Sequence, residues 1–182
     1  MGLFKPAWMS DNDKKALKAV EKERNQSKLC AIAKNAPYWL SRFKAVEKLA
    51  DQATLADAAK NDTDNMVRLK AAEKLTDQAL AQKIYVDMAK SHPNWFVRLE
   101  AAGKLADQTL AQETYVDAVK NSGDWIARLR AAEKLTDQTL AQITYADIAK
   151  NAAEHDTRKR AVEKLTDQAV LADVAKNDAK DL

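Results

Sequence analysis

The chain has 182 residues, with 30 Lys or Arg against 27 Asp or Glu, so its formal net charge is only +3. With 3 Gly, 3 Pro and a single Cys, the composition favours helices and excludes a disulfide-stabilised scaffold. No apolar run approaches the roughly 20 residues that a membrane helix needs. We therefore expect an all-α cytoplasmic protein that makes no contact with a membrane.

Residues 1–12 lack the apolar core and cleavage site of a secretion signal, and we interpret them as an N-terminal capping segment. Phe4, Trp8 and Met9 are expected to cover the open face of the first hairpin. The rest of the chain is a series of helical hairpins that leaves no linker, so we predict a single domain over 1–182. The predicted repeat units lie near 13–38, 39–64, 65–94, 95–124, 125–154 and 155–182.

Each repeat begins with a helix that carries an arginine within a recurring pattern such as VRLKAAEKLTDQ. We call this helix the inner helix. Apolar residues recur along it at steps of three and four, which places them on one side. In the repeat near 95–124 the inner helix is expected to end near Ala106–Asp107. The arginines are spaced by 26, 30, 30 and 30 residues, and they are Arg42, Arg68, Arg98, Arg128 and Arg158.

The second helix of each repeat follows an aspartate that can accept hydrogen bonds from its first N–H groups. Three repeats are four residues longer than the others, which adds about one helical turn and leaves the following residues facing nearly the same way. Tyr85, Tyr115 and Tyr145 occupy the position of Leu55 and are expected to be buried, with their hydroxyls at the edge. One hairpin cannot bury its apolar side alone, so its neighbours must cover it.

The segment from Asp64 to Leu75, DNMVRLKAAEKL, resembles the HEAT-like repeat, in particular the short variety of the phycobilisome lyase type. The resemblance implies a right-handed α-α superhelix, a HEAT-like α-solenoid of about six hairpins, with the arginine-bearing helices on the concave side. Hydroxylase relatives use paired His-Glu motifs to bind metal, whereas this chain has only His92 and His155. We therefore predict no metal site, no cofactor and no catalytic residues.

The arginines are interpreted as a structural ladder that pairs with aspartates of the second helices between neighbouring repeats. These aspartates are Asp57, Asp87, Asp117, Asp147 and Asp173.

A second set of residues forms the candidate partner-binding surface. In every clear copy of the repeat, the segment from the arginine to the seventh residue after it carries a net positive charge. Such a charge favours binding of an acidic segment or a phosphate backbone. The alternative is a solvated face on which neighbouring glutamates neutralise the lysines. Tryptophan at the start of three inner helices fits a binding hot spot, or instead a cation-aromatic pair with the arginine three residues later. The candidates are Trp39, Trp95, Trp125, Lys48, Lys74, Lys104, Lys134, Lys164, Lys70 and Arg130.

We interpret the chain as a non-enzymatic scaffold, expected to be a monomer, that binds an acidic peptide or protein partner on its concave surface. The alternative is a nucleic-acid-binding protein or a HEAT-like DNA glycosylase that uses the basic inner-helix stripe. However, a base-excising enzyme should interrupt the repeats around an acidic pocket, and these copies stay regular. A third alternative, a lyase-like chaperone for a pigment or cofactor, has only the family resemblance in its favour.

Overall fold

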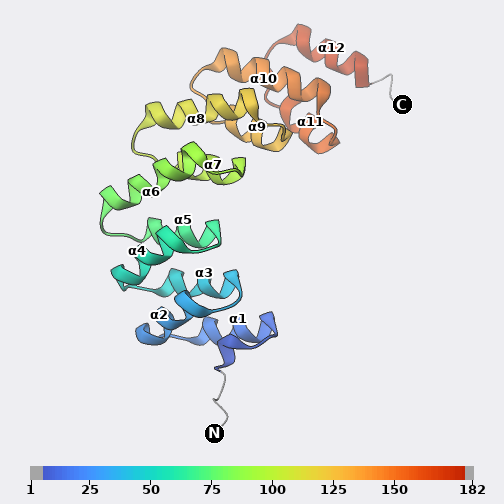
Figure 1. The fold of residues 1–182 in the computed structure, drawn as a ribbon. Coiled ribbons are helices and arrows are strands. Elements are labelled where there is room, and N and C mark those ends of the chain that lie inside the picture. The colour runs from blue at the N-terminus through green and yellow to red at the C-terminus, as the bar shows by residue number, and fades with distance from the viewer. Residues whose placement is uncertain (1–5, 179–182) are drawn as a thin grey trace. The chain divides into compact units, whose positions relative to one another are not determined.

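The computed structural model describes residues 6–178, and over this range every regular element is a helix (Figure 1). The predicted all-α fold class is thereby confirmed for the part of the chain described. A short 3-10 helix precedes the α-helices and contacts the first of them, while Phe4 lies outside the described residues. The elements are η1 (Ala7–Met9), α1 (Asp13–Lys22), α2 (Gln26–Asn35), α3 (Trp39–Lys48), α4 (Gln52–Asn61), α5 (Asn65–Glu73), α6 (Gln78–Ser91), α7 (Trp95–Ala102), α8 (Gln108–Asn121), α9 (Trp125–Ala132), α10 (Gln138–Asn151), α11 (His155–Val162) and α12 (Gln168–Asp178).

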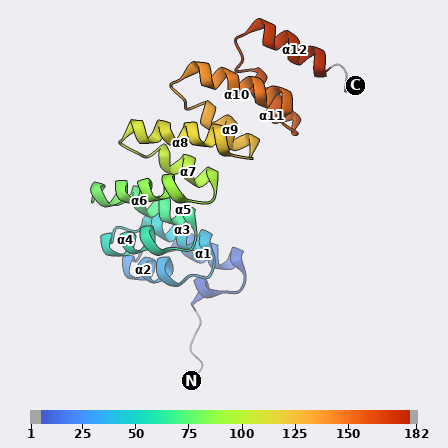
Figure 2. The ribbon, with the colours of Figure 1, turned by 45° about the horizontal axis from the view of Figure 1, so that its top comes forward.

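The chain divides into two compact units, Met1–Tyr85 and Val86–Leu182, which we call unit 1 and unit 2. In unit 1 the inner helices α1, α3 and α5 follow one another on one side, with α2 and α4 on the other (Figure 1). In unit 2, α7, α9 and α11 are the inner helices, and α8, α10 and α12 are the second helices, as the rotated view also shows (Figure 2). Helices in each unit contact those next to them or next but one, as stacked hairpins do.

Short polar side chains start most of these helices, as the sequence predicts. The Asp107 carboxylate accepts the N–H of Leu110 at the start of α8, and the Asp124 carboxylate accepts the N–H groups of Ile126 and Ala127 at the start of α9. One boundary was predicted wrongly, since α7 ends at Ala102 rather than near residue 106. The residues that follow form a turn, which brings the apolar Leu105 back into the core.

The core of each hairpin stack consists of small and medium apolar side chains, chiefly Ala, Leu and Val. The position after the arginine is buried in most copies, with Leu129 fully buried. In the last repeat this position is Lys159, which is exposed. The tyrosines at the leucine position are buried as predicted, since Tyr85, Tyr115 and Tyr145 are 4%, 6% and 6% exposed.

Candidate functional site

The arginines of unit 2 join consecutive hairpins. The Nε of Arg98 donates a hydrogen bond to the carbonyl of Ala89, which lies in the preceding helix α6, and Arg128 does the same to Val119 in α8. Each guanidinium also pairs with an aspartate of its own hairpin, Arg98 with Asp117 at 2.6 Å and Arg128 with Asp147 at 2.5 Å. The predicted pairs therefore form, but they lie within a hairpin. The contact with the neighbouring repeat is made to a backbone carbonyl instead.

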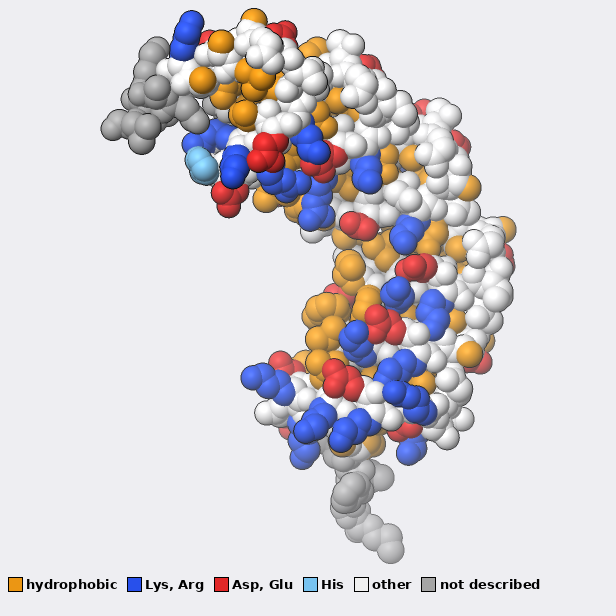
Figure 3. All heavy atoms as spheres, turned by 180° about the vertical axis from the view of Figure 1, so that it is seen from behind, with side chains coloured by type: hydrophobic (Ala, Val, Ile, Leu, Met, Phe, Trp, Pro, Cys, Tyr) orange, Lys and Arg blue, Asp and Glu red, His pale blue; other side chains and the backbone are white. Residues whose placement is uncertain are grey.

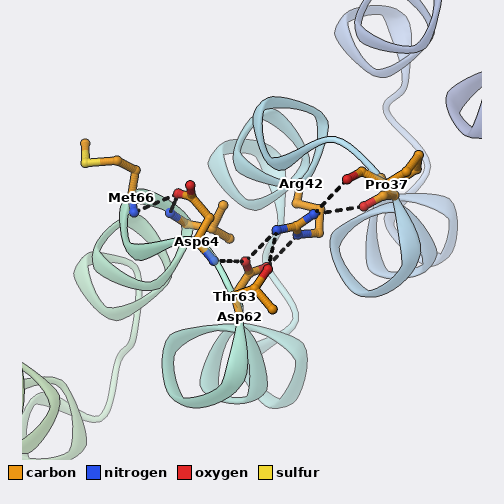
Figure 4. A network of polar contacts seen from close by, with 8 residues as sticks. Pro37, Arg42, Asp62, Thr63, Asp64 and Met66 are labelled. Carbon is orange, nitrogen blue, oxygen red and sulfur yellow. Dashed lines mark hydrogen bonds and ion pairs between the residues drawn. The ribbon is translucent and has the colours of Figure 1, made fainter. Parts of the chain in front are cut away.

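Arg42 pairs with an aspartate outside the predicted set. Arg42 forms a two-pronged ion pair with Asp62, with both N–O distances at 2.8 Å, and not with Asp57 (Figure 4). Its other nitrogen donates to the carbonyls of Ala36 and Pro37. The hydrogen bond to Asp62 raises the pKa of the Arg42 guanidinium above its ordinary value.

The local sequence explains this change of partner. Asp62 is the residue after α4, where the copies that follow have His92, Ser122 and Ala152, so among these turns only this one has a carboxylate at that position. The Asp62 side chain is 6% exposed, and it also accepts the N–H of Asp64, which fixes its position.

The remaining arginines also bond to backbone carbonyls. Arg68 donates to Ala59, and Arg158 donates to Ala152 and Ala153. Asp173 forms an ion pair with Lys150 at 2.6 Å. The place of Asp87 in the structural ladder stays a prediction.

Two of the three tryptophans pack against the arginines of their own helices. The guanidinium carbon of Arg98 lies 4.0 Å from the ring centre of Trp95, and that of Arg128 lies 4.7 Å from the ring centre of Trp125. This is the cation-aromatic alternative that the sequence analysis left open. Trp39 differs, because it is 46% exposed and meets the ring of Phe43 edge to face, with centres 6.3 Å apart. Trp39 is therefore the tryptophan most available to a ligand.

The lysines at the ends of the inner helices of unit 1 have a structural role that the sequence analysis missed. Lys48 Nζ donates to the carbonyls of Val20 at 3.0 Å and Glu21 at 2.5 Å, and Lys74 Nζ donates to the carbonyl of Glu47 at 2.5 Å. Each lysine thus caps the C-terminal end of the preceding inner helix, where the helix dipole favours a cation. Burial lowers the pKa of both ammonium groups.

Three groups of further cations lie on or directly after the inner helices. In unit 1, Lys44 and Lys70 pair with the glutamates three residues later in their own helices, at 2.8 and 3.0 Å. In unit 2, Arg160 pairs with Glu133 at 3.3 Å, and Arg130 lies over the ring of Phe96 at 5.1 Å. A third group, in unit 2, has side-chain ammonium groups that form no hydrogen bond or ion pair with any residue that the structure describes. These free cations are Lys134, Lys159 and Lys164.

Glutamines in the first two turns of the second helices form a contact between repeats that the sequence pattern did not reveal. In unit 2 the side-chain oxygen of Gln112 accepts the N–H of Thr136 at 2.9 Å, while its nitrogen donates to the carbonyl of Lys134 at 3.0 Å. Such a pair satisfies one donor and one acceptor in the turn after the next inner helix. We call this contact the glutamine bracket. It is formed by Gln26, Gln52, Gln112 and Gln142.

The glutamine bracket also explains how repeats of two lengths fit one scaffold. The residue whose carbonyl accepts the hydrogen bond lies 22 residues after the glutamine along the sequence, in both short and long repeats. The four extra residues lie before the glutamine, so they lengthen the start of the second helix and leave the contact with the next repeat unchanged.

The buried tyrosines make unfolding sensitive to alkaline pH. Burial raises the pKa of Tyr85 from 10.0 to about 12, with a contribution from the nearby Glu73. The unfolded chain therefore loses this proton first, and the free energy of unfolding should fall as pH rises from 10 to 12. Urea unfolding at several pH values should show a smaller fall for Tyr85→Phe than for the parent chain. The ultraviolet titration signal that the folded parent chain shows and Tyr85→Phe lacks belongs to Tyr85. If that signal titrates near pH 10, the raised pKa of Tyr85 is wrong.

The described residues contain no group of three His, Cys, Asp or Glu side chains placed to hold a metal ion. Between residues 6 and 178, no helix has the length and apolar character needed to cross a membrane. Comparison with family models, with curated proteins and with solved structures finds no match for this chain. The fold and contacts define an all-α helical-repeat protein, and its resemblance to HEAT-like repeats stays a prediction.

Proposed function

We propose that the protein is a non-enzymatic scaffold that binds a protein or peptide partner of acidic character on the exposed side of its inner helices. The observation that carries the proposal is the group of free cations, Lys134, Lys159 and Lys164, on and directly after α9 and α11. Arg128 and Arg158 of the same helices are half-buried and engaged by the scaffold, whereas these lysines are exposed and make no contribution to it that the described residues reveal. Cations that the fold does not use are available to a partner.

Their surroundings favour a protein partner over a polyanion such as nucleic acid. Lys and Arg side chains are interspersed with Asp and Glu side chains on the visible face, rather than gathered in a uniform basic patch (Figure 3). In unit 2, Glu100, Glu133 and Glu163 are exposed among the cations. A phosphate backbone would be repelled at these carboxylates, whereas a folded or extended peptide can place its own charges to match.

The proposal is tested by titrating the chain with a synthetic glutamate-rich peptide at several salt concentrations. Replacing Lys134, Lys159 and Lys164 together by Gln removes three exposed charge pairs of about 0.5 kcal/mol each, so affinity should fall about tenfold. A matched control replaces Lys83, Lys90 and Lys120 by Gln, which removes the same charge from exposed positions on the second helices. The control should bind like the parent chain.

Equal losses in the two triple variants would mean that only net charge matters, and the proposed surface would be wrong. A DNA duplex of comparable charge is titrated in parallel. Tighter, steeply salt-dependent binding of the duplex would replace the proposal with the nucleic-acid alternative. With the surface established, capture from a native lysate at low and high salt would identify the natural partner.

A further inference from the structure

Arg98 and Arg128 of unit 2 are held by the same set of groups. In each case the arginine Nε donates to the carbonyl of the residue nine positions earlier, and Nη2 pairs with an aspartate of the second helix. The asparagine four residues after that aspartate donates to its other carboxylate oxygen, at 2.6 Å for Asn121 and 2.8 Å for Asn151. We call this arrangement of carbonyl, carboxylate and amide the arginine cradle. Its residues are Ala89, Asp117 and Asn121 for Arg98, and Val119, Asp147 and Asn151 for Arg128.

Unit 1 has the same three residues at the matching positions of its repeat, and they are Ala33, Asp57 and Asn61. The side-chain nitrogen of Asn61 donates to the Asp57 carboxylate at 2.8 Å, as its counterparts do in unit 2. Arg42, however, is turned toward Asp62 (Figure 4). Within residues 6–178, the Asp57 carboxylate therefore forms no ion pair.

The backbone carbonyl of Ala33 is the second acceptor of this cradle. It lies in the last turn of α2, where carbonyls have no partner inside the helix, and Pro37, four residues later, has no N–H to donate. No other donor in the described part of the chain reaches this carbonyl, although Ala33 is only 3% exposed. Carbonyls of buried residues are normally paired, and the counterparts at Ala89 and Val119 each accept an arginine Nε.

A pocket of about 170 Å³ lies at this cradle of unit 1, between α2 and α4. Its lining includes Ala33, Asp57 and Asn61, together with Thr54 and Lys34. A cavity of about 150 Å³ is enough to hold benzene. The pocket therefore has room for a planar guanidinium group, which is smaller than a benzene ring.

The charges at the pocket match those of a cradle that holds arginine. Asp62 also borders the pocket, but its carboxylate is already in an ion pair, so Lys34 and Asp57 are the charges that a ligand meets. Lys90 and Asp117 stand at the same two positions in the repeat of Arg98. A lysine at this position is thus compatible with a guanidinium held beside the aspartate.

We propose that this pocket binds a guanidinium group, the end of an arginine side chain on a partner protein. The guanidinium donates to the Ala33 carbonyl and pairs with Asp57, as Arg98 does with Ala89 and Asp117. Arginine suits the site because its planar fork reaches two acceptors in fixed directions. The site goes beyond the proposed function, since it takes a cation in unit 1, whereas the free cations of unit 2 take an acidic segment.

The test titrates the full chain with three probes, followed by NMR of the amide resonances. The probes are Nα-acetyl-arginine amide, Nα-acetyl-lysine amide and free arginine. Lysine is the competing occupant, because Lys150 pairs with Asp173 at the matching positions of the last repeat. Saturable shifts of the Asn61 side-chain amide are expected. Blocked arginine should bind about tenfold more tightly than blocked lysine, which makes one hydrogen bond fewer. The Asn121 amide should not shift, since Arg98 holds that cradle.

Two variants and a matched control locate the binding. Asp57→Asn removes the carboxylate and should weaken binding of blocked arginine about tenfold. Glu113→Gln removes one exposed charge from α8 and should leave binding unchanged. Asp62→Ser places the residue found at Ser122 into the turn after α4, so Arg42 should turn to Asp57 and exclude the probe. Circular dichroism confirms that each variant keeps its helices.

The proposal is overturned if blocked arginine causes no saturable shift in the parent chain, or if Asp57→Asn or Asp62→Ser binds it as the parent does. Equal binding of blocked lysine would assign the site to any cation. Binding of free arginine alone would assign it to the amino acid rather than to a side chain of a partner. The glutamate-rich peptide is titrated separately, so failure of this site and failure of the unit 2 surface are distinguishable.

Discussion

Replacing Arg128 by methionine is expected to lower the free energy of unfolding by about 2 to 3 kcal/mol. The Arg128 side chain is 19% exposed, pairs with Asp147, donates to the Val119 carbonyl at 3.0 Å and covers the Trp125 ring. Methionine keeps most of the length of the side chain but leaves a carboxylate and a carbonyl without their donor. Losing one partner of a half-buried charged pair costs more than the loss of a surface ion pair.

Urea unfolding followed by circular dichroism measures this change, and Lys134→Met is its control. Lys134 lies six residues further along the chain, is exposed and belongs to the free cations, so its replacement should change stability by less than about 0.5 kcal/mol. Similar changes in the two variants would mean that Arg128 is not a structural joint. A repeat array can unfold in parts. The unfolding curves of the two variants must therefore be compared in steepness, which reports cooperativity, as well as in midpoint.

The sequence was sufficient for the features that depend on local geometry. The aspartate before each second helix predicted a helix cap, and the Asp107 cap at the start of α8 forms. Spacing of three and four residues placed Val97 and Ala101 on the buried side of an inner helix, and both are buried. These inferences need only the periodicity of one helix and the unpaired N–H groups at its start.

The contacts between repeats were harder to predict because they depend on which backbone groups the next hairpin presents. Lys48 was interpreted as part of a binding surface, yet its ammonium group caps the preceding inner helix. Likewise Asp57 has the same place in its repeat as Asp117, but a carboxylate at Asp62 lies closer to the arginine. In both cases the sequence identifies the charged residue, but it does not show which group that residue contacts.

A usable signal for these contacts was nevertheless present in the sequence. Gln52 and Gln112 stand at the same distance before the next lysine of the pattern, although four residues are inserted elsewhere in the longer repeat. A polar residue whose spacing to the next repeat survives an insertion is expected to contact that repeat.

Replacing Leu129 by alanine is expected to cost about 3 kcal/mol, the largest single effect that we predict. Leu129 is fully buried in α9, and α9 contacts α7, α8, α10 and α11. Loss of a fully buried leucine removes its transfer free energy and leaves a cavity, which together cost about 2 to 5 kcal/mol. Ile143→Ala, at a residue that is 61% exposed on α10, is the matched control and should be nearly neutral.

Hydrogen exchange can show which helices lose stability in Leu129→Ala. Since each hairpin depends on its neighbours for cover, Leu129→Ala should weaken amide protection in α7 to α11 by the full loss of stability. The amides of α2 and α3, which pack within unit 1, should keep most of their protection. A uniform loss across all helices would instead mean that the chain opens as one cooperative body. In that case a ligand held by the inner helices of one unit would stabilise both units equally.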